Sequence, residues 1–162
     1  MDASEHRRLG VDLNNSTWAV LSAGGLSPEA SADARDDLLY GAYASAYHWR
    51  HAEGATVANR ARAEHLISRT ATSVGLFVVG LDHGMRCLEL CVDNPAGVED
   101  WDFAFAYEAI ARALAGLGKR RDARKQRRVA AERGAAIKDE EDRKVFLAEF
   151  AREPWFGMAI GD

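Results

Sequence analysis

The sequence predicts an all-α fold in which about seven helices form an antiparallel stack of helical hairpins. Only three prolines interrupt the 162 residues and alanine is abundant, which favours helix over sheet. No long segment alternates polar and apolar residues with the period of two that marks strands. A pattern around Gly75 recurs around Gly118, 43 residues later, and repetition on this scale is typical of helical repeat arrays. We therefore predict one helical-repeat domain over residues 1–162.

Residues 5–53 are expected to form two leading helices. The first, over 5–23, carries apolar residues at helical spacing. Ser27 is a natural cap for the second, over 28–51, because a serine side chain can accept a hydrogen bond from a free N–H group at a helix start. Gly54 then ends this helix.

Two helix pairs follow, over 56–92 and 100–137. Thr56 provides the cap of the first pair. Gly75 and Gly118 separate the two helices within each pair, because glycine readily adopts the left-handed conformation that ends a helix.

The end of the chain is expected to close the stack. A helix over 139–151 begins at Asp139 and would cap the last pair. The remaining residues, 154–162, form an apolar tail. Exposed apolar clusters often mark interfaces, so one hypothesis is a homodimeric adaptor joined through this tail. Its contact residues would be Trp155, Phe156, Met158 and Ile160.

The stretch from Thr56 to Ile137 resembles the tetratricopeptide repeat family, whose unit is an antiparallel helix pair of about 34 residues. In that family the first helix carries an aliphatic residue followed by a small one and ends in glycine, and the second helix carries small residues about two turns apart. The matching residues are Ile67, Ser68, Gly75, Gly80 and Cys87 in the first copy, and Ile110, Ala111, Gly118, Ala123 and Ala130 in the second. The chain departs from the family in about nine extra residues between the pairs, and it has Glu64 and Tyr107 where the family has a tryptophan.

The resemblance implies a right-handed superhelix and a non-catalytic scaffold that binds a protein or peptide in a concave groove. The first helix of each pair would line that groove. Its outward-facing positions are Arg62, His65, Arg69, Phe105, Glu108 and Arg112. Arginine binds carboxylates through two hydrogen bonds, so an acidic peptide is the expected ligand. The alternative is that Glu108 and Arg112 form an ordinary ion pair, one turn apart, on a solvated face.

A metal site or an enzyme is the competing hypothesis. Its candidate residues are His48, His51, His83, Cys87 and Cys91. Imidazole and thiolate groups bind zinc, but the last three residues follow one helical stripe at ~6 Å steps, too far apart for one ion. A buried structural role is expected for the cysteines. The sequence contains no nucleophile or phosphate-loop motif, so no cofactor is predicted, although catalytic groups can converge from distant positions.

Residues 119–133 form a strongly basic helix that could serve a nucleic-acid-associated regulator. The net charge of −4 argues against general nucleic-acid binding, and the acidic run after Asp139 is expected to pair with the basic helix. Two cysteines and the absence of a secretory segment favour the cytoplasm. No apolar run approaches the ~20 residues that a membrane helix needs.

Overall fold

The computed structural model describes residues 1–159, and within them the chain is helical with no β-strand, as predicted. The helices are α1 (Ala3–Ser22), α2 (Ala32–His51), α3 (Val57–Ser73), α4 (Phe77–Asp93), α5 (Asp100–Gly116), α6 (Arg120–Ala135) and α7 (Glu140–Phe150), with a 3₁₀ turn η1 (Pro95–Gly97) before α5. Along these described residues, none of the helices combines the length and the apolar character needed to cross a membrane.

Most helix ends lie where the capping signals predict them. The Thr56 side chain accepts a hydrogen bond from the Asn59 N–H at the start of α3. Gly75 and Gly118 have positive φ angles of 86° and 73°, the left-handed conformation that closes α3 and α5. The repeated glycine pattern therefore has a direct physical cause in the two helix ends.

The start of α2 corrects the prediction made from Ser27. Ser31 caps the helix, and its side chain accepts from the Ala34 N–H. Ser27 instead caps a separate turn, where its hydroxyl oxygen accepts from the Glu29 N–H at 3.1 Å. The same capping residue occurs twice within a few positions, and local sequence does not decide which one starts the long helix.

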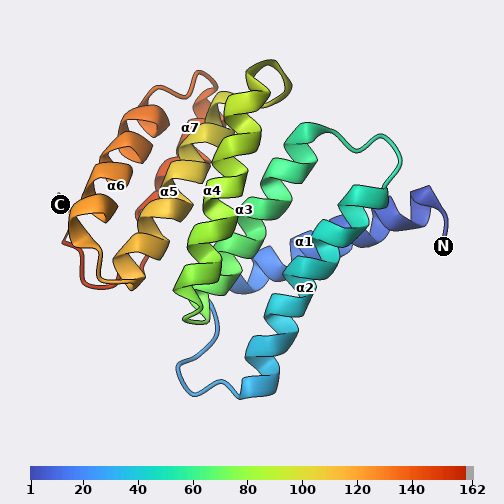
Figure 1. The fold of residues 1–162 in the computed structure, drawn as a ribbon, viewed down its shortest axis with the longest axis horizontal. Coiled ribbons are helices and arrows are strands. Elements are labelled where there is room, and N and C mark those ends of the chain that lie inside the picture. The colour runs from blue at the N-terminus through green and yellow to red at the C-terminus, as the bar shows by residue number, and fades with distance from the viewer. Residues whose placement is uncertain (160–162) are drawn as a thin grey trace.

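Successive helices pack against each other along the chain, so the structure is a stack of hairpins (Figure 1). The odd-numbered helices also touch one another, α1 with α3, α3 with α5, and α5 with α7. The even-numbered helices pack mainly against their neighbours in sequence. We call the α1, α3, α5 and α7 side the inner layer, and the candidate site lies on it.

Small side chains allow the helices to approach closely, as predicted. All six of the expected positions are buried, namely Ser68, Gly80, Cys87, Ala111, Ala123 and Ala130. At Gly80, an added methyl group would overlap the Thr72 hydroxyl and lie 3.1 Å from the Ser68 carbonyl oxygen. The Ser68 hydroxyl donates to the Gly80 carbonyl at 2.6 Å, so a side chain of α3 is bonded directly to the main chain of α4.

The apolar tail folds back onto its own chain, which corrects the picture of an exposed interface. Trp155 and Met158 are 1% and 4% exposed and pack with Ile110 and Leu114 of α5. Phe156 is half-buried, with its ring 5.0 Å from that of Phe77. Ile160, the fourth residue proposed for a homodimer, lies outside the described residues. Trp155 and Met158 therefore belong to the core of their own chain, and a homodimer through the tail stays a prediction.

Candidate functional site

The inner layer contains an open pocket of about 360 Å³, formed by four helices that are not consecutive in the chain. Of the six residues predicted for the groove, Arg62, His65 and Phe105 line this pocket. The complete lining is Asn14, Trp18 and Ser22 from α1, Arg62 and His65 from α3, Trp101 and Phe105 from α5, and Val145 and Glu149 from α7. The other three predicted residues lie deeper, beneath α7 and the tail.

Aromatic rings dominate the pocket walls. The Trp18 ring stacks on the His65 ring, with centroids 5.5 Å apart and planes at 25°. Phe105 approaches His65 from α5 at 5.3 Å, and Trp101 meets Phe105 edge-on at 6.1 Å. These separations are typical of favourable aromatic pairs, so the walls are rigid as well as apolar.

His65 is neutral at physiological pH. Its side chain is 7% exposed, and burial, together with the nearby positive charge of Arg69, lowers its pKa to about 3. Its Nε2 atom is buried and has no hydrogen-bond partner within residues 1–159. Buried polar atoms are normally paired, so the missing partner is expected to be water or a bound group.

Arg62 lies at the rim of the pocket and is fixed by the start of α5. Its Nε and Nη2 atoms donate to the two carboxylate oxygens of Asp102 at 2.8 and 3.0 Å. The guanidinium carbon is 4.1 Å from the centre of the Trp101 ring. Nη1 forms no hydrogen bond within the described chain. This nitrogen remains available to a ligand, while the charge of the side chain is balanced by Asp102.

A buried ionic cluster closes the deeper end of the groove. One carboxylate oxygen of Glu108 accepts from Arg69 Nη1 at 3.0 Å and from Arg112 Nε at 2.8 Å. Burial raises the pKa of Glu108, but the two guanidinium groups outweigh it, and the pKa lies below its ordinary value. Glu108 and Arg112 do form the predicted ion pair one turn apart, but at 0% and 1% exposure it is not on a solvated face.

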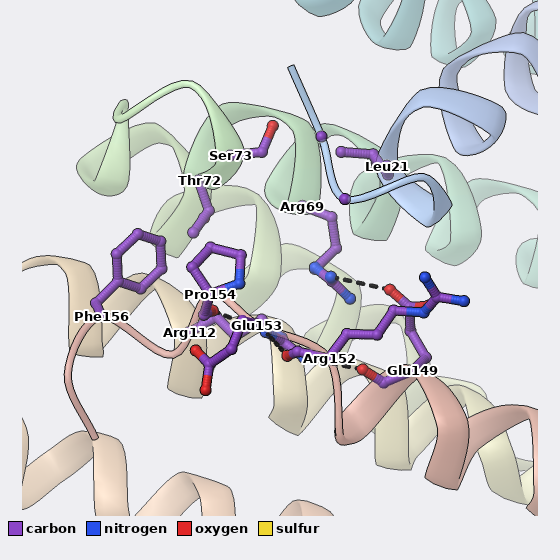
Figure 2. A pocket seen from close by; sticks show the side chains of 12 residues that line it. Leu21, Arg69, Thr72, Ser73, Arg112, Glu149, Arg152, Glu153, Pro154 and Phe156 are labelled. Carbon is purple, nitrogen blue, oxygen red and sulfur yellow. Dashed lines mark hydrogen bonds and ion pairs between the residues drawn. The ribbon is translucent and has the colours of Figure 1, made fainter. Parts of the chain in front are cut away.

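Arg112 holds the segment that follows α7. Its Nη1 atom donates to the carbonyl oxygens of Arg152 and Pro154 at 2.9 and 2.8 Å, and its Nη2 atom donates to that of Glu149 at 3.0 Å. Figure 2 shows this closed end, with Arg69 reaching towards Glu149 and the segment from Glu149 to Phe156 running across it. Only a space of about 30 Å³, the size of one water molecule, remains there.

These contacts bear on the expected ligand chemistry. Arg62, Arg69 and Arg112 are all paired with carboxylates of their own chain. Much of the positive charge at these positions is therefore balanced within the chain, and an acidic peptide as the ligand stays a prediction.

The residues proposed for a metal site lie in separate places. His83 joins three helices through Tyr43 Oη, 3.0 Å from Nε2, and Glu64, 2.5 Å from Nδ1. Cys87 and Cys91 are buried, and their mutual hydrogen bond, followed by burial, raises the pKa of Cys87. Within residues 1–159, no group of three or more His, Cys, Asp or Glu side chains is placed to hold a metal ion.

His48 and His51 gather instead with a histidine that the sequence analysis did not single out. His6 of α1 lies 2.8 Å from His48, Nδ1 to Nδ1, and its ring is 5.3 Å from that of His51. Burial and the two neighbouring histidines lower the pKa of His48. The cluster connects α1 to α2 and lies away from the pocket.

The basic helix uses its inner arginines to hold the tail. Arg127 is 8% exposed and donates to the Ala159 carbonyl at 2.8 Å, with its guanidinium carbon 4.2 Å from the Trp155 ring centre. Within residues 1–159, the acidic residues at the start of α7 pair with their own helix, whereas the sequence suggested pairs with the basic helix. Glu140 and Glu141 pair with Lys144 of α7 itself, at 3.1 and 2.9 Å. Residues three or four apart on a helix are neighbours, so these pairs do not depend on how the two helices are arranged.

Several pocket residues were missed from the sequence. Trp101 lies four positions before Phe105 on the same face of α5, and this spacing could have identified it. Trp18 and Val145 come from helices outside the repeated pairs, so the repeat pattern carries no signal for them.

Comparisons with known proteins supply no relative. No protein-family model, curated protein or solved structure matches this chain. The likeness to tetratricopeptide repeats therefore stays a prediction from the sequence, and functional inference depends on the pocket.

Proposed function

We propose that this protein is a non-catalytic scaffold that binds a segment of a partner protein in the open pocket of its inner layer. The observation that carries this proposal is the aromatic pocket of about 360 Å³ assembled by α1, α3, α5 and α7. Its volume falls within the ~300–1,000 Å³ typical of ligand sites. Such sites combine apolar walls with a few placed polar groups, which here are Arg62 and His65.

The polar groups of the pocket support binding rather than proton-transfer chemistry. A general base works best with a pKa near the operating pH, whereas the pKa of His65 is about 3. Arg62 is held by Asp102, and Glu149 is paired with Arg69 at 3.1 Å. Two of the three polar groups are thus engaged in ion pairs within the chain.

A chain segment already occupies the neighbouring part of the same layer. The tail runs over Arg112, which binds main-chain carbonyls, and it inserts Trp155 into the core. Glu149 lines both this closed end and the open pocket, so the two are neighbours on the inner layer. This internal contact supports a peptide segment as the occupant of the open part.

Selection from a random peptide library displayed on phage tests the proposal. Val145 is 63% exposed at the pocket rim, so Val145→Arg should block the pocket without disturbing the core. Leu147→Arg is the matched control, because Leu147 is 46% exposed on the same helix and does not line the pocket.

We expect selected peptides to bind the wild type and Leu147→Arg alike with micromolar dissociation constants, and Val145→Arg at least ~10-fold more weakly. Circular dichroism would verify that both variants fold. Failure to enrich any peptide, or equal binding to Val145→Arg, would refute the scaffold.

A further inference from the structure

We propose that the pocket accepts an uncharged aromatic side chain as the anchor of the bound segment. This inference rests on the proposed function and specifies which residue of the partner enters the pocket. It combines the ring geometry of the walls, the charges around them, an unpaired buried nitrogen and the way in which the chain holds its own tail.

The walls are suited to a further ring. Trp18, Trp101 and Phe105 present apolar surfaces from α1 and α5. Their existing ring contacts are stacked at Trp18, and tilted or edge-on at Phe105 and Trp101. Water against such apolar surface is unfavourable. A rigid ring would displace this water at a small cost in side-chain entropy.

Charges around the pocket disfavour ionised anchors of either sign. The guanidinium carbons of Arg62 and Arg69 are 4.1 and 5.9 Å from the Trp101 and Trp18 ring centres. These cations already occupy the favourable positions over the rings, so a lysine or arginine anchor would add like charge. An acidic anchor would meet the Glu149 carboxylate in the pocket wall. A neutral side chain avoids both costs.

The pocket wall also contains an unfilled hydrogen-bonding position. His65 is more than nine-tenths buried between Trp18 and Phe105, and its Nε2 atom has no partner in the described chain. At the rim, Arg62 Nη1 has no hydrogen-bond partner within residues 1–159. His65 thus places a neutral imidazole beside the proposed ring site. The Arg62 Nη1 atom can donate a hydrogen bond to a main-chain carbonyl of the segment.

The tail shows how this layer holds an aromatic anchor. Trp155 is 1% exposed, and its ring centre lies 4.1 Å from the Arg112 guanidinium carbon. The same arginine binds the carbonyls of Arg152 and Pro154, on the chain just before that ring. In the tail, a ring is buried and the carbonyls just before it bind an arginine. A partner segment would be held in the same way if its ring entered the open pocket and its carbonyls bound Arg62.

Nuclear magnetic resonance of the ¹⁵N-labelled full chain tests the anchor directly. The probes are the N-acetyl amides of phenylalanine, tyrosine, leucine, lysine and glutamate. The readout is the indole N–H signals, assigned with single Trp→Phe variants. Trp18 and Trp101 report on the pocket, whereas Trp49 and Trp155 are buried elsewhere and serve as internal controls.

We expect the phenylalanine and tyrosine amides to shift the Trp18 and Trp101 signals saturably at millimolar concentration, at least ~5-fold more tightly than the other three amides. Val145→Arg should weaken the binding of the two aromatic amides at least ~10-fold, and Leu147→Arg should leave their binding unchanged. The proposal is overturned if the leucine, lysine or glutamate amide binds as tightly, if all four indoles respond equally, or if Val145→Arg has no effect.

The two proposals fail in distinguishable ways. Library peptides that bind without an aromatic residue, and without moving the Trp18 and Trp101 signals, would overturn the anchor and leave the scaffold standing. Aromatic amides that bind although no library peptide is enriched would overturn the scaffold and retain the aromatic site.

Discussion

Arg69 and Arg112 occupy equivalent positions in the two helix pairs, and both donate to the same oxygen of Glu108, at 3.0 and 2.8 Å. Their side chains are 7% and 1% exposed. The shared carboxylate therefore pairs with two guanidinium groups beneath α7, and Glu149 supplies a second carboxylate to Arg69. These arginines connect the inner layer internally, and they are poor candidates for contacting a partner.

Glu108→Gln should be strongly destabilising. The substitution keeps the shape of the side chain but leaves two buried guanidinium groups without their shared carboxylate, and breaking a buried ion pair typically costs about 3–5 kcal/mol. Urea denaturation would measure the change in the free energy of unfolding. Glu141→Gln is the control, because its side chain is 81% exposed, and we expect a change within about 0.5 kcal/mol. Equal effects for the two variants would contradict the buried cluster.

Acid should destabilise the protein in part through His65. Because its pKa falls from about 6.5 in the unfolded chain to about 3 in the folded one, the unfolded chain binds more protons between these values. The contribution of His65 to the free energy of unfolding is therefore fully present above pH 6.5 and is lost as the pH falls towards 3. Between pH 7.5 and 5 the loss from this group should be about 2 kcal/mol.

His65→Gln isolates this contribution. Urea unfolding of the wild type and the variant at pH 7.5 and 5 should show a smaller pH dependence in the variant, because glutamine does not titrate. Leu147→Gln, an exposed substitution that removes no titratable group, should keep the pH dependence of the wild type. An unchanged pH dependence in His65→Gln would mean that His65 is not buried as a neutral imidazole.

Trp155→Ala should destabilise the monomer rather than dissociate a dimer. The indole is 1% exposed among apolar residues of α5 and α6, and truncating such a side chain costs about 3–5 kcal/mol. Thermal unfolding with light scattering would report stability and mass together. Leu147→Ala, at an exposed position, should cost less than about 1 kcal/mol. A loss of mass in Trp155→Ala without loss of stability would indicate that the tail forms an interface.

Gly80→Ala tests the close contact of α3 and α4. Alanine favours helix over glycine by about 1 kcal/mol, but its methyl group would overlap the Thr72 hydroxyl. We expect the overlap to dominate and to give a net loss of about 1–3 kcal/mol. Adding Thr72→Ala should restore part of this loss, since the two changes share one contact. Additive losses in the double variant would place the strain elsewhere.

Local signals in the sequence determined the helices and many of their boundaries. The cap at Thr56 and the left-handed glycines at Gly75 and Gly118 act through hydrogen bonds and backbone conformation within a few residues. Ser68 and Gly80 are also visible in the sequence as small residues at helix positions. Two helices in close contact need small side chains between them, whichever helix is the partner. The all-α stack could therefore be predicted from the sequence before any tertiary contact was known.

Only the tertiary structure decided which inner-face residues stay open. Helical spacing placed His65 and Arg69 on one face of α3, but it could not show that α7 and the tail cover Arg69 while His65 remains in a pocket wall. That outcome depends on Glu149 and Trp155 packing onto helices far away in the chain. The reason is physical: periodicity fixes the direction in which a side chain points, whereas its exposure depends on which distant segment gains most by burying its own apolar surface there.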